Sequence, residues 1–114
     1  MKAVLLMAHG APQDLEEVEE YILRIRHGRP LAPELIETIR ARYRKIGGSP
    51  LLHRTLRQAE ALQIRLREKH NETDRVYVGM RYAHPFISET VDRMLLESVD
   101  SLVALCMAPQ FSNL

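Results

Sequence analysis

A histidine at the end of an apolar run is the first residue of this chain whose type and position could do chemistry. His9 and Gly10 follow the run AVLLMA, and Pro12 comes two residues later. An imidazole there could bind a metal ion or transfer a proton, or it could be a structural histidine hydrogen-bonded at a strand terminus. Gly10 permits a sharp turn and the close approach of a flat ligand. A lone His-Gly pair is not specific, so both roles stay open.

A second group of candidates is cationic. The segment IRHGRP brings Arg26, His27 and Arg29 together. Arginine forks bind carboxylates through two hydrogen bonds, but basic residues also favour the negative end of a helix. His84, before a proline, could likewise be a ligand or a helix cap.

Other familiar sites are missing from the sequence. Gly47-Gly48-Ser49 has neither the Gly-Lys-Ser ending nor the preceding strand of a phosphate loop, and there is no nucleophile elbow or metal-ligand pair at helical spacing. His53 and His70 fall on a long amphipathic segment, and we expect both on the surface. The single cysteine, Cys106, lies in an apolar run and is expected to be a small buried hydrophobe.

The elements that must position these residues alternate between strand and helix patterns. Three apolar runs, Ala3–Ala8, Arg75–Met80 and Leu102–Ala108, indicate strands covered on both faces. Four helices are expected between them: one after the capping-box pair Asp14 and Glu17 and ending near Gly28, one from Pro33 to Gly47-Gly48, one from Leu51 to His70 with Asn71 as its stop, and one after Pro85. The order β-α-α-α-β-α-β predicts an α/β fold with a parallel sheet.

Each helix has an apolar stripe that should face the core. The expected inward residues are Leu15, Val18, Ile22 and Ile25 in the first helix, Leu35, Ile36, Ile39, Tyr43 and Ile46 in the second, Leu52, Leu56, Ala59, Leu62 and Leu66 in the third, and Ile87, Val91, Met94 and Leu95 in the fourth.

Ligands of an open parallel sheet bind beyond the carboxyl ends of its strands. Here these ends deliver His9-Gly10, the segment Arg81–Pro85 and the segment Pro109–Ser112, which should share one rim. Three strands leave the sheet edges poorly sheltered. We therefore expect an incomplete domain, or a partner that covers the edge.

Composition limits the function classes. The chain has 114 residues, 46% hydrophobic and 27% charged, which suits one globular domain. A net charge of +1 gives no case for nucleic acid as a partner. No apolar run is long enough for a membrane span, and no signal peptide is recognised. These features, with a lone cysteine, favour the cytoplasm.

Several stretches together resemble the N-terminal part of a ferrochelatase, and the resemblance covers essentially the whole chain. They are LLMAHGAP, IRHGR, YRKIGGSPL, RQAEAL, YVGMRY and APQFS, in that order. The family inserts ferrous iron into a porphyrin in haem biosynthesis, and its fold has two Rossmann-like domains with the porphyrin between them. The arginine- and glycine-containing IRHGR segment is similar to that of the bacterial enzymes that use coproporphyrin. The resemblance thus implies iron and porphyrin as substrates, with no further cofactor.

The resemblance also implies residue roles. His9 occupies a position often held by tyrosine, facing the porphyrin metal, and imidazole is a better iron ligand than a neutral phenol. Arg26 and His27 match the segment that holds a propionate, and Ser49 matches a loop near the pocket. Tyr82 falls where some relatives have histidine, which weakens any metal-entry role there.

One departure is important. The family's catalytic histidine and its acidic partner lie in a second domain that is absent from residues 1–114, so the catalytic residues are unknown here and the isolated chain is expected to be inactive. Two alternatives remain: a short homodimeric chelatase of the cobalamin or sirohaem type, and a non-catalytic porphyrin-binding fragment. Partners of the chain could be a missing C-terminal domain or a second copy.

Overall fold

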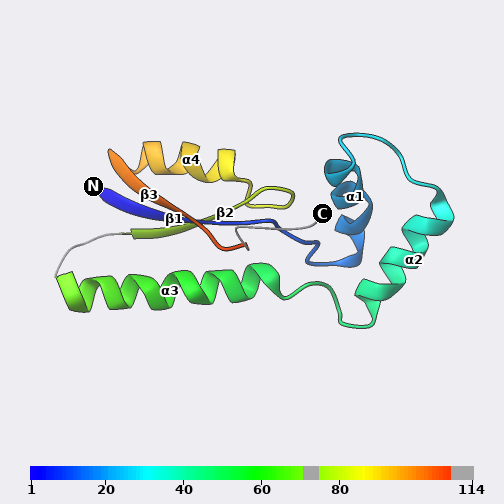
Figure 1. Cartoon of the computed structure of the whole chain (residues 1–114), viewed down its shortest axis with the longest axis horizontal. Coiled ribbons are helices and arrows are strands. Elements are labelled where there is room, and N and C mark those ends of the chain that lie inside the picture. The colour runs from blue at the N-terminus through cyan, green and yellow to red at the C-terminus, as the bar shows by residue number, and fades with distance from the viewer. Residues whose placement is uncertain (71–74, 109–114) are drawn as a thin grey trace.

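A three-stranded parallel sheet with helices on both faces forms the body of the molecule (Figure 1). The computed structural model describes residues 1–70 and 75–108, and the expectations for the His70 side chain, Asn71 and Pro109–Ser112 fall outside this description. The element order is β1 (Lys2–Ala8), η1 (Leu15–Glu17), α1 (Val18–Ile25), α2 (Pro33–Arg44), α3 (Leu51–His70), β2 (Arg75–Met80), α4 (Ile87–Leu96) and β3 (Ser101–Cys106). The expected α/β class and element order are confirmed.

Strand β1 lies in the centre, in the order β2-β1-β3. Ala8 pairs with Met80 of β2, and Met7 pairs with Cys106 of β3, so all three strands end at one edge. The third strand ends at Cys106 rather than at Ala108, as its apolar pattern had suggested.

Alternate side chains of the strands form two cores, one on each face. On one face Leu6, Val78 and Met80 pack against Ala59 of α3. On the other, Ala3, Leu5 and Tyr77 pack against Met94 of α4. The continuous apolar runs of β1 and β2 follow from this burial on both faces.

The local signals for the helices act largely as expected. Asp14 accepts hydrogen bonds from the backbone N–H groups of Glu16 and Glu17, while Glu17 reaches back to Gln13. The first turn is a 3₁₀ turn, and Gly28, with φ of +83°, closes α1 by donating its N–H to the Leu23 carbonyl at 2.7 Å. Helix α3 has the expected bounds, and the Ser49 hydroxyl caps its first turn by accepting a hydrogen bond from the Leu51 N–H at 3.2 Å.

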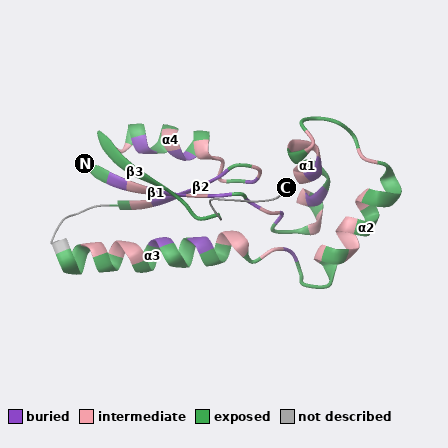
Figure 2. Cartoon of the chain, viewed as in Figure 1, coloured by how far each residue is buried: buried purple, intermediate pink, exposed green. Residues whose placement is uncertain are grey.

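Several expected core positions are wrong. Leu56 of α3 is 48% exposed because Thr55, one residue earlier, takes the buried position, and Leu95 of α4 is 68% exposed beside the buried Thr90 and Met94. Helix α2 has no buried residue, and it ends at Arg44, before Ile46. Helices α1 and α2 pack on each other beyond the carboxyl edge of the sheet, so α2 has no second layer against it among the described residues (Figures 1 and 2).

The two edges of the sheet differ. The outward backbone groups of β2 are partly capped: Gln63 accepts from the Val76 N–H at 3.1 Å, Thr90 donates to the Val78 carbonyl at 2.8 Å, and the Pro85 carbonyl accepts from the Met80 N–H at 2.8 Å. In the part of the chain that the structure describes, nothing pairs with the outer edge of β3, and all six of its residues are exposed.

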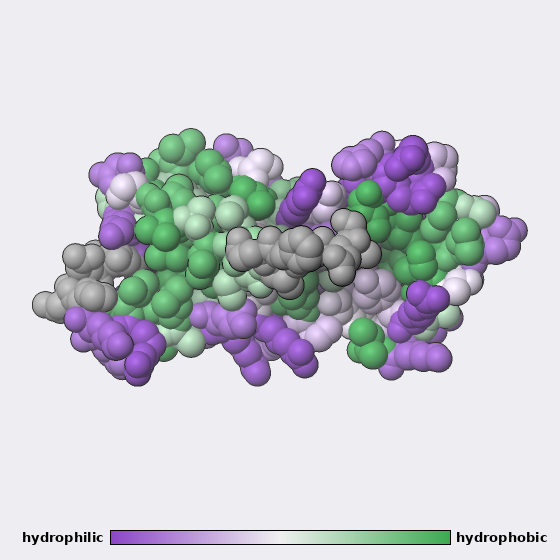
Figure 3. Space-filling view, viewed as in Figure 1, coloured by the Kyte–Doolittle hydropathy of each residue, from purple (hydrophilic) through white to green (hydrophobic). Residues whose placement is uncertain are grey.

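Cys106 is among these exposed residues, which corrects the expectation that it is buried. The apolar run around it did predict a strand, but no described helix covers that strand. Figure 3 shows the result as a hydrophobic area over β3 and α4, separate from a second one over α1 and α2.

Candidate functional site

The expected rim exists at the carboxyl edge of the sheet. The backbone ladder between β1 and β2 continues past the strands: the Arg81 N–H donates to the Ala8 carbonyl at 3.0 Å, and the Tyr82 N–H donates to the His9 carbonyl at 2.9 Å. His9 is exposed at this rim. The segments that follow β1 and β2 are therefore held side by side, as the parallel arrangement predicts.

Gly10 allows this close approach. Its φ is +93°, a conformation that side chains disfavour, and a Cβ there would lie 3.0 Å from Ala83. The sharp turn expected at Gly10 is confirmed. Gly10 is buried, and the group that lies close to it is Ala83, in the segment after β2.

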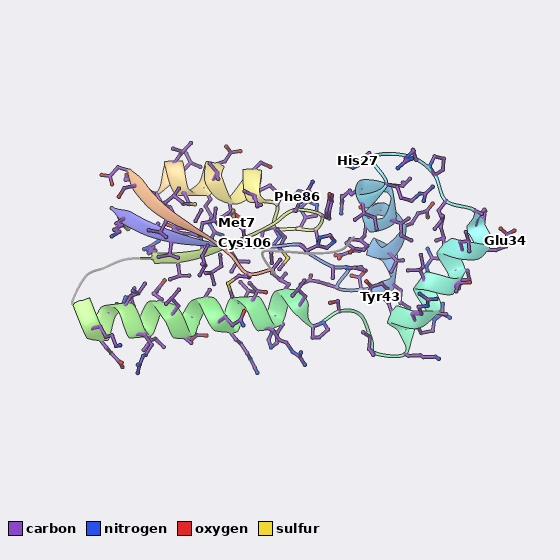
Figure 4. The ribbon with its side chains drawn as sticks, viewed as in Figure 1. Met7, His27, Glu34, Tyr43, Phe86 and Cys106 are labelled. Atoms are coloured by element: carbon purple, nitrogen blue, oxygen red, sulfur yellow. The ribbon has the colours of Figure 1, made fainter. Side chains whose placement is uncertain are left out.

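Two hollows flank His9. One, of about 250 Å³, is lined by residues of the strand ends, the segments that follow them and the first residue of α4: Met7, Ala8, His9, Arg81, Ile87, Cys106 and Ala108. The other, of about 280 Å³, lies toward α3: Ala8, His9, Leu51, Arg54, Thr55, Gln58, Met107 and Ala108. Met7 and Cys106, which line the first hollow, are paired on the neighbouring strands β1 and β3 and are labelled in Figure 4. Each hollow thus combines apolar walls, the His9 imidazole and one arginine.

Aromatic rings surround His9. The Tyr82 ring lies edge-on to the imidazole, with 4.8 Å between centroids and 62° between planes. Tyr21 of α1 lies at 6.3 Å and 78°. Burial, with smaller contributions from Tyr43 and Tyr82, raises the pKa of Tyr21, so its phenol stays neutral at physiological pH.

Two arginines fix Tyr82. The Arg81 guanidinium lies 4.8 Å from the centroid of the Tyr82 ring, and Nη1 of Arg24 donates to the Tyr82 carbonyl at 3.4 Å. Arg24 also lies over the Phe86 ring at 4.8 Å, which ties α1 to the loop between β2 and α4. Sequence reasoning did not include Tyr21, Arg24 or Arg54 among the candidates, and it considered Tyr82 only as a departure.

The other predicted porphyrin-binding residues lie apart from His9. Arg26 and His27 lie at the end of α1, where the Arg26 Nε donates to the Arg29 carbonyl and the Arg29 Nε to the Arg26 carbonyl, both at 3.1 Å. Arg26 therefore shapes its own loop, and it also lines an apolar hollow of about 400 Å³ between α1 and α2. His27 is exposed, with φ of +55° (Figure 4).

Ser49 connects the loop before α3 to the segment that follows β1 through a backbone hydrogen bond. Its N–H donates to the Pro12 carbonyl at 2.9 Å, and its hydroxyl caps α3. The loop that precedes α3 is therefore attached to the segment that leaves β1, three residues after His9.

His84 takes the position expected of a residue near a helix start. Its Nδ1 lies 2.7 Å from Oε1 of Glu89, the same oxygen that accepts from the Phe86 N–H at 3.0 Å. The Phe86 N–H first, and His84 to a lesser degree, lower the pKa of Glu89. These contacts favour a role at the start of α4 over a role as a rim ligand.

No protein-only metal site stands out in the described ranges, 1–70 and 75–108: no group of three or more histidine, cysteine or acidic side chains is placed to hold a metal ion. A single imidazole beside two hollows suits a metal that other ligands hold on its remaining sides. Within those same ranges, the search for a helix long and apolar enough to span a membrane found none.

Comparison with known proteins decides the family. The family model described as Ferrochelatase matches residues 1–114. The chain belongs to the ferrochelatase family.

The relatives agree with this assignment. The chain is 44% identical, over 97% of its length, to a ferrochelatase of Acidobacterium capsulatum, and 38% identical, over 98%, to one of Herpetosiphon aurantiacus. It is 40% identical, over 96%, to a coproporphyrin III ferrochelatase of Bacillus mycoides. The chain spans only 32% to 37% of the length of these relatives.

Proposed function

We propose that this chain forms the N-terminal porphyrin-binding wall of a ferrochelatase, an enzyme that inserts ferrous iron into a porphyrin in haem biosynthesis. Residues 1–114 would be one part, and a second domain would supply the catalytic histidine and its acidic partner. The family supports this proposal, and so does the geometry at His9. The observation that carries it is one exposed imidazole at the carboxyl rim, between two apolar hollows that each contain an arginine.

The reaction explains why such an imidazole is useful. A free-base porphyrin and Fe²⁺ give the iron porphyrin and two protons, which leave the pyrrole nitrogens. The macrocycle supplies four nitrogens around the metal, so a protein ligand is needed on an axial side only. An imidazole side chain can offer a ring-nitrogen lone pair to a metal or accept a proton, so His9 would either bind the iron or take up one of the two protons. Proton removal from the opposite face needs a second wall.

Porphyrin carboxylates need cations at the edge of the same surface. Arg26 is our candidate for one propionate, with His27 beside it in the chain and Ser49, at the loop before α3, as a separate candidate contact. Because its guanidinium also bonds to its own loop, Arg26 would present its remaining N–H groups from a fixed position. Coproporphyrin III or protoporphyrin IX is the proposed substrate, and the Bacillus mycoides relative favours the former.

Binding of free-base coproporphyrin III by the purified chain tests the proposal directly. We expect saturable quenching of porphyrin fluorescence, weakened in His9→Ala. With Fe²⁺ added anaerobically, the absorbance change of metal insertion should not exceed the spontaneous rate. Failure to bind any porphyrin would contradict the proposal.

Arg26 has its own test. Arg26→Ala should weaken binding of coproporphyrin III about tenfold, as expected for a lost charged hydrogen bond. It should leave binding of a propionate-free porphyrin within about twofold. Equal losses for both porphyrins would mean that Arg26 acts only by shaping its loop.

A homodimeric short chelatase is a second candidate, and the exposed outer edge of β3 favours it. Two copies could then supply two walls. The family match to ferrochelatases argues for the first proposal. Iron insertion by the chain alone, together with a dimer in analytical ultracentrifugation, would favour the second. For either candidate we propose a cytoplasmic protein that does not bind nucleic acid.

A further inference from the structure

We propose that Tyr82 is a positioning residue for His9: its ring fixes the orientation of the strand-end imidazole. The effect of this orientation on metal binding rests on the proposed function. The orientation itself is a property of the free protein and does not depend on that function. The inference starts from an apparent conflict. His9 is exposed, yet a residue meant to face a metal must hold one orientation.

Hydrogen bonds from the residues that the structure describes do not supply that orientation. Metal-binding histidines usually have their second ring nitrogen bonded to a carboxylate or a carbonyl, which fixes the ring. Within residues 1–70 and 75–108 we find no hydrogen bond or ion pair to the His9 ring. Its ring contacts are instead aromatic, with Tyr82 at 4.8 Å and Tyr21 at 6.3 Å between centroids.

Tyr82 suits this role because it is itself held at three places. Its N–H donates to the carbonyl of His9, so the two backbones have a fixed register. Its carbonyl accepts from Arg24, and its ring lies under the Arg81 guanidinium. A side chain that is already ordered loses little further conformational entropy when it restrains a neighbour.

Tyr21 supplies the second contact, from a different element. Because α1 carries both Tyr21 and Arg24, this helix contacts the imidazole directly and also holds Tyr82. Edge-on aromatic pairs of this kind stabilise one arrangement over others by an amount that corresponds to a factor of about three to ten in population. His9 would then bind an axial metal with less loss of side-chain freedom than an unrestrained histidine.

The first experiment needs no ligand. The ¹H–¹³C NMR signals of the His9 ring, assigned by their loss in His9→Ala, should show ring-current shifts in the full 114-residue chain. Tyr82→Phe retains the ring and should retain these shifts. Tyr82→Leu should move them toward the positions of a free histidine, and Tyr21→Leu should do so less. Circular dichroism checks that each variant is folded.

The second experiment measures the consequence with ferric coproporphyrin III as the probe. The Soret band and electron paramagnetic resonance spectrum report axial imidazole binding, with His9→Ala as the reference for its absence. Tyr82→Leu should weaken this ligation about three- to tenfold, while Tyr82→Phe stays within about twofold of the wild type.

The two experiments separate the two proposals. If Tyr82→Leu and Tyr21→Leu both leave the His9 ring signals unchanged, the positioning role is wrong, whatever the probe does. If the His9 ring signals move as expected but neither the wild type nor any variant binds ferric coproporphyrin III, the proposed function fails while the positioning role stands. If the Tyr82→Leu chain is unfolded, Tyr82→Met, a second variant without an aromatic ring, decides the outcome through the same signals.

Discussion

Gly48 shows how a single residue fixes the frame of the rim. Its φ is +95°, and a Cβ at this position would lie 1.8 Å from the Gln13 carbonyl oxygen. This close packing accompanies the hydrogen bond from the Ser49 N–H to the Pro12 carbonyl. Gly48 therefore lets the loop before α3 lie directly against the segment that follows His9.

Replacing Gly48 should be costly. Gly48→Ala combines a left-handed backbone with a clash against backbone atoms, so we expect a loss of about 2–5 kcal/mol in unfolding free energy. Gly47→Ala is the matched control, because its φ is also positive but no atom lies within 4 Å of its Cβ position. It should lose only about 1–2 kcal/mol in urea unfolding. Equal losses would show that the contact with Gln13 contributes nothing.

Thr90 is the buried polar side chain that joins α4 to β2. Its hydroxyl donates to the Val78 carbonyl at 2.8 Å. Thr90→Val keeps the shape but leaves that carbonyl without its donor, so urea unfolding should show a loss of about 1–3 kcal/mol. Thr38→Val, at an exposed site of α2, should change stability by less than about 0.5 kcal/mol. If Thr90→Val leaves the unfolding free energy unchanged, another group can donate a hydrogen bond to the Val78 carbonyl.

At the scale of elements, the start of α4 makes the protein sensitive to acid. Glu89 accepts from the Phe86 N–H and contacts His84, and these contacts lower the pKa of its carboxyl below the usual 4.5. A lowered pKa in the folded state stabilises the protein above the unfolded value. This contribution is lost as pH falls through the lowered pKa.

The prediction concerns the difference between two proteins. The melting temperature of the wild type should exceed that of Glu89→Gln at pH 7, and the gap should close below about pH 4. Measuring the difference removes the effect of the other carboxyl groups. A gap that persists unchanged at pH 2 would show that the ionised form of Glu89 does not matter.

Sequence patterns predict the helices and strands better than they predict which residues of each element are buried and what covers them. Helix α3 was placed at Leu51–His70 because Ser49 and Pro50 give a strong local start signal. The expectation that Leu56 and Leu95 are buried is wrong because more than one stripe of residues along each helix can be drawn through apolar side chains, and only packing selects the buried one. Cys106 was misplaced because an apolar strand pattern does not reveal whether anything covers the strand.

The candidate site could be predicted only in part, because local patterns place a residue on an element but do not show which elements lie side by side. The end of β1 indicated His9, since ligand sites of parallel sheets lie at strand ends. The contact between His9 and Tyr82 depends on β2 lying beside β1. The hydrophobic pattern of a strand does not reveal which strand is its neighbour, so this contact could not be predicted. For Arg26 and Ser49 the sequence could not predict the hydrogen bonds that each makes within or between loops, because these bonds depend on how the chain turns.

At the scale of the whole molecule, exposed apolar area is the main feature. Leu102, Val103 and Leu105 of β3 are each 44–50% exposed, and Leu95 and Leu96 of α4 are also exposed. An exposed apolar edge strand is a ready template for pairing with another chain. The isolated chain should therefore associate as its concentration rises.

A charge on that edge should reduce the association. In sedimentation velocity, Val103→Lys should shift the population toward the monomer. Ser88→Lys adds the same charge at an exposed site of α4 and should have little effect. If both variants associate as strongly as the wild type, the contact between copies lies elsewhere, for instance on the α1–α2 pair.

The unlike edges of the sheet also matter to anyone who would modify this protein. Side chains of α3 and α4 and the loop after β2 already occupy much of the outer side of β2, so a strand-forming peptide tag would find few backbone groups there. Along β3 the same tag would find them free in the described structure. A fluorescent strand peptide should thus label one side of the sheet only, and a split reporter built on this chain should be divided so that its complementing strand adds next to β3.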